Sequence, residues 1–198
     1  MRAIEFFFDY GSPYSYLANA LLPEIARRHA ASLVYRPMLL GGVFKATGNQ
    51  SPMQVPVAAK RAYGAIALRR TASHIGVPIA MNPHFPINTL GLMRLAVAAQ
   101  QAGVFEPLHA ALYPAFWVKG LDLADAAVVA EVVAGAGLDA AALAARAETG
   151  AVKDALRAST EEAVARGVFG APALFFADEL YFGVDHLPHL ERALEEST

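Results

Sequence analysis

The hydrophobic pattern of the first forty residues predicts a strand, a helix and a second strand. Arg2–Asp9 is an apolar, aromatic-rich run typical of a buried strand, and Ser32–Met38 contains the strand formers Leu, Val and Tyr. Between them, Pro13–Ala30 carries apolar residues at helical spacing. This β-α-β order predicts that the two strands pair in parallel and are joined by a right-handed crossover.

The middle of the chain is predicted to be mostly helical. Residues 40–56 are interrupted by Gly and Pro, which predicts a loop with a short turn of helix near Val43–Thr47. Beyond it, glycines separate segments with helical periodicity, and Asp122, Asp139 and Thr149 are candidate helix caps. The predicted helices are Val57–Ile75, Asn88–Ala102, Phe105–Trp117, Ala124–Ala134, Ala140–Thr149 and Lys153–Arg166.

The end of the chain returns to β structure. Pro172–Phe176 and Leu180–Phe182 are predicted strands on either side of a turn, and His186–Glu195 is a predicted helix. The resulting order, β-α-β, a block of helices, then β-β-α, predicts an α/β fold with a large all-helical insertion. The predicted domains are a discontinuous α/β domain, residues 1–40 and 165–198, and a helical domain, residues 41–164.

Composition excludes several classes of protein. Apolar residues make up 56% of the 198 residues and charged residues 17%, which favours a compact globule over a disordered chain. The net charge of −2, without a basic patch, argues against a nucleic-acid partner. No apolar run has the length of a membrane span and the start lacks a signal-peptide pattern, so we expect no membrane partner and a cytoplasmic protein. The absence of Cys excludes disulfides and a Cys nucleophile, and the His spacing predicts no metal site.

The segment between the first strand and the first helix carries the strongest candidate chemistry. Ser12 lies at the predicted helix N-terminus, where unpaired N–H groups and the helix dipole favour an anion, and Pro13 suits the first turn. The stretch Ser12-Pro13-Tyr14-Ser15 stands where a thioredoxin-like protein would carry Cys-x-x-Cys. A thiolate site in a chain without Cys suggests that a ligand brings the thiol. The alternative is that Ser12 is an ordinary helix cap.

Two turns near the C-terminus are further candidates. The bond before Pro172 can be cis, which would leave the backbone of Ala171 able to pair with an extended peptide; the alternative is a plain turn. Asp185 precedes the last helix and is a candidate N-cap, a carboxylate that accepts an α-ammonium group, or both. In the second case, the N–H groups of Val184 and Asp185 would face the same ligand.

These segments together carry a resemblance to a known family. FDYGSPYSYLA, GVFGAP and YFGVDHLPHLE, in this order and spacing, resemble the 2-hydroxychromene-2-carboxylate isomerases and the related kappa-class glutathione transferases of the DsbA-like thioredoxin superfamily. The resemblance covers essentially the whole chain and implies a thioredoxin-like domain with a helical insertion. It further implies an isomerase that uses glutathione as a cofactor, acts on a small aromatic carboxylate and forms a homodimer.

The resemblance also implies a glutathione site. Ser12 matches the residue whose hydroxyl holds the glutathione sulfur, and Ala171, before Pro172, matches the residue that pairs with the cysteinyl backbone. Val184 and Asp185 match the turn that receives the γ-glutamyl end. The remaining matches are Lys45, near the glycyl carboxylate, and Asn49, Gln54 and Val55, in a loop expected to close over the peptide.

Some positions stay open. The family motif has Asp-Arg where this chain has Asp185-His186, so a carboxylate contact from that Arg is in doubt. Arg94 is either a substrate anchor or part of a structural ion pair. The aromatic residues between Phe105 and Trp117 are either packing residues or walls of a substrate pocket.

The proposed activity is a glutathione-dependent cis–trans isomerisation of 2-hydroxychromene-2-carboxylate or a similar intermediate of aromatic catabolism. The alternatives are a kappa-class-like transferase or peroxidase that consumes glutathione, and a thioredoxin-like module that binds ligands without turnover. A thiol–disulfide oxidoreductase needs a Cys that the chain lacks.

Overall fold

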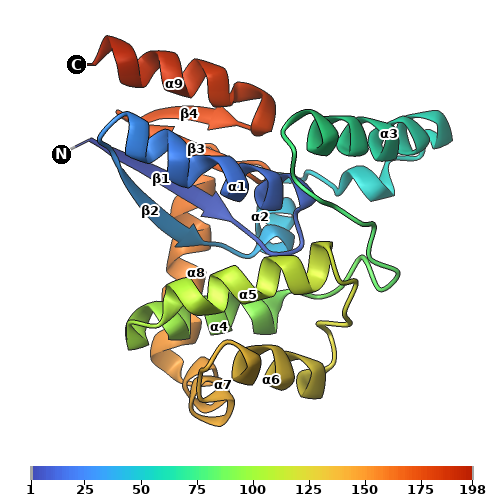
Figure 1. Cartoon of the computed structure of the whole chain (residues 1–198), viewed down its shortest axis with the longest axis vertical. Coiled ribbons are helices and arrows are strands. Elements are labelled where there is room, and N and C mark those ends of the chain that lie inside the picture. The colour runs from blue at the N-terminus through green and yellow to red at the C-terminus, as the bar shows by residue number, and fades with distance from the viewer. Residues whose placement is uncertain (1, 198) are drawn as a thin grey trace.

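The computed structural model describes residues 2–197, and the strands among them form one mixed sheet (Figure 1). The strands β1 (Ala3–Phe8), β2 (Ser32–Pro37), β3 (Ala173–Phe176) and β4 (Glu179–Phe182) lie in the order β2-β1-β3-β4. β1 and β2 pair in parallel, as predicted, whereas β3 is antiparallel to both of its neighbours. The α/β fold expected from the element order is therefore confirmed, with the block of helices between β2 and β3.

Helices connect and cover these strands. They are α1 (Pro13–Arg28), α2 (Leu40–Thr47), α3 (Ala58–His74), α4 (Leu90–Ala102), α5 (Phe105–Trp117), α6 (Ala126–Gly135), α7 (Ala140–Ala147), α8 (Gly150–Ala165) and α9 (Leu187–Glu196), with 3-10 turns η1 (Pro52–Gln54) and η2 (Val184–His186).

Helix caps explain where several of these helices begin. Asp139 and Thr149 cap α7 and α8 as predicted, and α8 begins earlier than expected because Thr149 accepts a hydrogen bond from the N–H of Val152. The prediction of Asp122 as a helix cap was wrong. α6 begins after Asp125, whose carboxylate accepts from Ala127 at 2.8 Å.

Strand β1 is apolar at successive positions because it is buried on both faces. Phe6 and Phe8 point to the face covered by α1 and α9, and Phe7 points to the face covered by α2 and α8. Figure 1 shows α1 crossing the front of the sheet while α8 passes behind it. The carboxyl end of β1, where the chain turns into α1, is thereby enclosed by helices from both sides.

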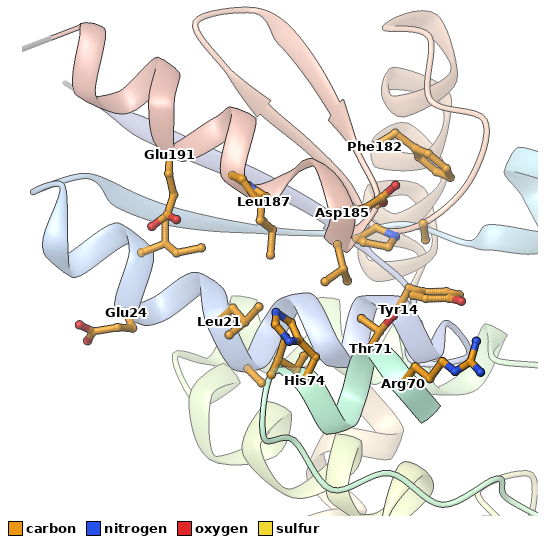
Figure 2. Close-up of a pocket in the computed structure, with 18 of the residues that line it drawn as sticks. Tyr14, Leu21, Glu24, Arg70, Thr71, His74, Phe182, Asp185, Leu187 and Glu191 are labelled. Carbon is orange, nitrogen blue, oxygen red and sulfur yellow. The ribbon is translucent and has the colours of Figure 1, made fainter. Parts of the chain in front are cut away.

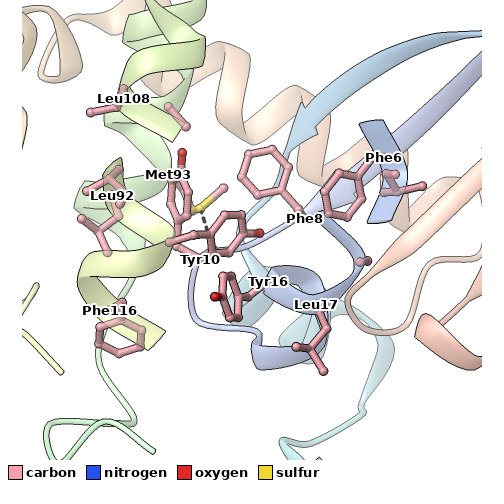
Figure 3. Packing of buried hydrophobic residues seen from close by; sticks show 14 of the residues in the cluster. Phe6, Phe8, Tyr10, Tyr16, Leu17, Leu92, Met93, Leu108 and Phe116 are labelled. Carbon is pink, nitrogen blue, oxygen red and sulfur yellow. Dashed lines mark hydrogen bonds between the residues drawn. The ribbon is translucent and has the colours of Figure 1, made fainter. Parts of the chain in front are cut away.

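The helical segment shares its core with the sheet. Met93 of α4 and Phe116 of α5 belong to the same buried cluster as Phe8 of β1 and Leu17 of α1 (Figure 3). Figure 1 shows α4 to α7 gathered at one end of the sheet. One apolar core thus spans the predicted α/β domain and the predicted helical domain. The boundary between the two stays a prediction.

Helix α3 lies at the edge of the molecule, beside α1 (Figure 1). Only Leu68 and Ala72 of this helix are buried, and Tyr63 is 61% exposed. The C-terminal half of α3 is therefore the part that packs on the body of the protein. No helix among the described residues is both long enough and apolar enough to cross a membrane.

Candidate functional site

Ser12 lies where the sequence places it, at the N-terminus of α1. Its Oγ accepts a hydrogen bond from the N–H of Ser15 at 3.1 Å, so the helix-cap interpretation is confirmed. The same hydroxyl donates to the carbonyl of Ala171 at 3.0 Å, across 159 residues of sequence. Ser12 is only 3% exposed. A hydroxyl has one proton, so in this arrangement that proton is directed at Ala171.

Ala171 precedes Pro172 in a cis peptide bond, as the sequence suggested. The carbonyl of Pro172 accepts a hydrogen bond from Gly183 at 3.0 Å, which joins this turn to the turn before α9. Gly170 lies under the ring of Phe182, and a Cβ at this position would come within 2.9 Å of that ring. The Gly-Ala-Pro segment is therefore held against Ser12 on one side and against the end of β4 on the other.

A buried carboxylate holds the turn that carries Ser12. Asp9 accepts hydrogen bonds from the N–H groups of Gly11 and Leu40, each at 2.8 Å, and from the hydroxyl of Thr89 at 2.9 Å. Burial raises the pKa of Asp9, and these three hydrogen bonds oppose the rise. Asp9 is not among the site residues predicted from the sequence. The available signal was a carboxylate directly after a strand buried on both faces.

A cavity of about 1000 Å³ opens beside Ala171 and Pro172, between α1, α3 and α9 (Figure 2). Val184 and Asp185 line one end, as does Tyr14 of α1. Leu21 and Leu187 face the cavity from α1 and α9 and form an apolar stretch along its length. One cavity, next to the buried Ser12, is therefore lined by four of the predicted site residues: Ala171, Pro172, Val184 and Asp185.

Asp185 is exposed and has no capping role. Helix α9 begins after His186 without a side-chain cap, so the interpretation of Asp185 as its N-cap is wrong. The carboxylate lies over Gly183, where a Cβ would come within 2.5 Å of Oδ1. Burial, and then the negative charge of Asp185, raise the pKa of Tyr14. The Tyr14 phenol is consequently neutral at physiological pH and retains its proton.

The predicted loop residues lie outside the cavity wall. Asn49 donates to the carbonyl of Phe169 at 2.8 Å, which connects the segment after α2 to the Gly-Ala-Pro turn. Gln54 is exposed in η1, and the carbonyl of Val55 accepts from Arg61 at 2.6 Å. Asn49 is thus the loop residue with a direct link to the site.

Lys45 is not brought together with these residues. It lines a second cavity of about 800 Å³ between α2, α4 and α8, together with Arg94 and Lys153. Arg94 and Lys153 both pair with Glu148, at 3.2 and 2.7 Å. The structure therefore favours the ion-pair interpretation of Arg94, and Lys45 does not line the cavity that Ala171 and Asp185 share.

The aromatic residues of α5 pack in the core rather than in the cavity. Trp117 donates to the carbonyl of Tyr10 at 2.9 Å, and Phe116 is fully buried. His109 lies 3.0 Å from the Tyr10 hydroxyl and 2.8 Å from Oδ1 of Asn19. Burial lowers the pKa of His109 to about 3, so its ring is neutral, with Nε2–H donating to Asn19 and Nδ1 accepting from Tyr10.

Comparison with known proteins places this geometry in context. The family model described as a DSBA-like thioredoxin domain matches residues 3–195. A solved structure of 2-hydroxychromene-2-carboxylate isomerase aligns with a TM-score of 0.83 and 28% identity, covering 98% of this chain and 95% of the other.

Curated relatives carry two kinds of name. The 2-hydroxychromene-2-carboxylate isomerase of Sphingobium xenophagum is 33% identical over 193 residues, which is 98% of each chain. Glutathione S-transferase kappa 2 of Caenorhabditis elegans is 28% identical and covers 98% of this chain and 92% of its own. The chain thus resembles isomerases and transferases over its whole length.

Proposed function

Because the chain belongs to the 2-hydroxychromene-2-carboxylate isomerase family of DsbA-like thioredoxin-domain proteins, we propose that it is a glutathione-dependent cis–trans isomerase. The proposed substrate is 2-hydroxychromene-2-carboxylate or a similar aromatic carboxylate. The single observation that carries the proposal is the Ser12 hydroxyl, held at a helix N-terminus and beside the Ala171 backbone in a protein without Cys.

The residues present fit a glutathione peptide through an exchange of hydrogen bonds. The Ser12 hydroxyl donates to the Ala171 carbonyl in the protein alone. In the complex, the cysteinyl N–H of the peptide would donate to that carbonyl instead, and the Ser12 hydroxyl would donate to the sulfur. One hydrogen bond within the protein would thus be replaced by two to the peptide, and the bond from Ser12 to a thiolate would be charge-assisted.

The two ends of the peptide would meet different parts of the site. Val184 and Asp185 would receive the γ-glutamyl end, where the Asp185 carboxylate can pair with the α-ammonium group. Asn49, Gln54 and Val55 would approach the other end, with Asn49 fixed by its bond to Phe169. Lys45 lines the second cavity, so the proposed site does not include it.

The chain's own groups would stabilise and orient rather than react. When bound, glutathione supplies a thiolate nucleophile that adds reversibly to a conjugated double bond and so permits rotation about it. Ser12 and the N-terminus of α1 would hold the negative charge on sulfur, which favours the reactive form. The apolar wall of Leu21 and Leu187 would keep the substrate beside that sulfur, which is a gain from positioning.

Calorimetry with glutathione and an absorbance assay on 2-hydroxychromene-2-carboxylate test the proposal. Wild type should bind glutathione and convert the substrate only when glutathione is present. Ser12→Ala should raise the pKa of bound glutathione and lower turnover by about 100-fold or more, because it removes a preorganised donor. Ser15→Ala is the matched control, since Ser15 is a buried serine of the same helix turn and the contact with Ala171 is made by the Ser12 hydroxyl. An unchanged thiolate absorbance titration in Ser12→Ala would contradict the role of Ser12.

A transferase of the kappa type is the second candidate, favoured by the 28% identity to glutathione S-transferase kappa 2. It would use the same Ser12 site and consume one glutathione for each product. An isomerase regenerates glutathione. Measuring total thiol before and after complete conversion therefore separates the two: constant thiol supports the isomerase, and stoichiometric loss supports the transferase.

A further inference from the structure

One face of α3 turns an arginine and a histidine toward the cavity. Arg70, Thr71, His74 and Ile75 line it, and Arg70 and His74 are one helical turn apart. Figure 2 shows Arg70 beside Tyr14, at the end of the cavity where Asp185 lies, and His74 nearer to Leu21. These two side chains therefore follow the length of the cavity from the Ser12 end toward its apolar stretch.

The other cation in the cavity is already neutralised. Arg28 pairs with Glu191, and its Nε lies 3.9 Å from Glu24, and both acids also line the cavity. By contrast, the side chains of Arg70 and His74 form no ion pair and no hydrogen bond with another residue in the part of the chain from 2 to 197. On the α3 face, Arg70 thus supplies a positive charge that no acidic side chain among the described residues pairs with.

We propose that Arg70, supported by His74, is a carboxylate-binding pair of this cavity. A guanidinium presents two parallel N–H donors that match the two oxygens of a carboxylate. The neighbouring apolar surface of Leu21 and Leu187 would cover the hydrocarbon part of the same ligand. The ligand class is an amphipathic carboxylate.

The identity of the carboxylate rests on the proposed function, which brings two into the cavity. One is the carboxylate of the aromatic substrate, and the other is the α-carboxylate at the γ-glutamyl end of glutathione. Both are recognised by the same chemistry. The Asp185 carboxylate repels either of them at its own position, so each would be directed across the cavity to α3.

Substitution of Arg70 by Gln, with Arg69→Gln as the matched control, tests the pair. Arg69 is adjacent, on the same helix and exposed, but it does not line the cavity. Calorimetry would use three probes with wild type and both variants: 2-hydroxycinnamate, its methyl ester, and glutathione. His74→Gln is a second variant that changes the same face without altering Arg70.

Wild type should bind 2-hydroxycinnamate more tightly than the methyl ester, and Arg70→Gln should lose about tenfold in affinity for a carboxylate, whereas Arg69→Gln should not. Loss for 2-hydroxycinnamate alone assigns the pair to the substrate, and loss for glutathione alone assigns it to the γ-glutamyl end. The proposal would be overturned if Arg70→Gln bound 2-hydroxycinnamate and glutathione each as tightly as wild type does. It would also be overturned if Arg69→Gln lost as much affinity as Arg70→Gln. If wild type binds no glutathione, the proposed function fails, and the 2-hydroxycinnamate measurements still decide the carboxylate pair.

Discussion

The hydroxyl of Thr89 donates to the carboxylate of Asp9 over 2.9 Å and so joins the end of β1 to the start of α4. The same carboxylate accepts from Gly11 in the turn before Ser12 and from Leu40 at the start of α2. Three segments around Ser12 are therefore fixed to the buried side chain of Asp9. The position of Ser12 depends on a contact with the helical segment as well as on its own helix.

Replacing Asp9 by Asn should destabilise the protein by about 1–3 kcal/mol, because an amide offers one acceptor oxygen and turns an NH2 group toward a backbone N–H. Urea denaturation of wild type and variant measures this difference. Asp125→Asn is the control: Asp125 caps α6 on the exposed surface, and Asn caps equally well. Equal changes in the free energy of unfolding in the two variants would show that the buried contacts of Asp9 stabilise the protein no more than an exposed helix cap does.

Gly11 leaves no room for a side chain beside Thr89. A Cβ at position 11 would lie 2.9 Å from Cγ2 of Thr89 and 3.3 Å from Oδ1 of Asp9. Gly11→Ala should therefore cost about 1–3 kcal/mol through overpacking. In the double variant with Thr89→Ser, the methyl group is gone while the hydroxyl for Asp9 remains, so part of the loss should be recovered. Thermal or urea unfolding of the four proteins of this cycle measures the coupling, and strictly additive effects would contradict the contact.

Local pattern predicted most of the secondary structure, because strand and helix periodicity are properties of short segments. The four strands and the helix Phe105–Trp117 follow directly from apolar spacing. Helix α2 was expected to be only a short turn within a loop, because its Gly pair lowers helix propensity. Packing of Val43 beneath the sheet outweighs that preference.

The site was only partly accessible from the sequence. Ser12, Ala171 and Asp185 occur in short motifs, so their neighbourhood could be expected from the motifs alone. The roles of Asp9 and Arg70 depend on where α4 and α3 pack, and no short segment encodes that. For the same reason Lys45 could not be placed: the orientation of α2 directs it to the cavity beside α8.

Replacing Asp185 by Asn should weaken glutathione binding about tenfold or more while the fold stays intact, because the change removes the negative charge that faces the α-ammonium group. Since Asp185 does not cap α9, no loss of helix stability is expected. Calorimetry gives the affinity, and urea denaturation checks the fold. The control Asp178→Asn changes an exposed Asp in the turn between β3 and β4, at φ 64°, a conformation that Asn tolerates. Unaltered affinity in Asp185→Asn would count against the γ-glutamyl role.

His109 should make the protein sensitive to mild acid. Its pKa falls from 6.5 to about 3 on folding because it is buried, so below pH 6.5 the unfolded chain binds a proton that the folded protein does not. The stability from the neutral ring is complete above pH 6.5 and is lost as the pH falls toward 3, at up to about 1.4 kcal/mol per pH unit. His109→Gln removes the titration, so the urea midpoint should fall less between pH 7 and pH 5 than in wild type. The exposed His189, replaced by Gln, should leave the wild-type slope unchanged, and an equally steep slope in His109→Gln would show that another group causes it.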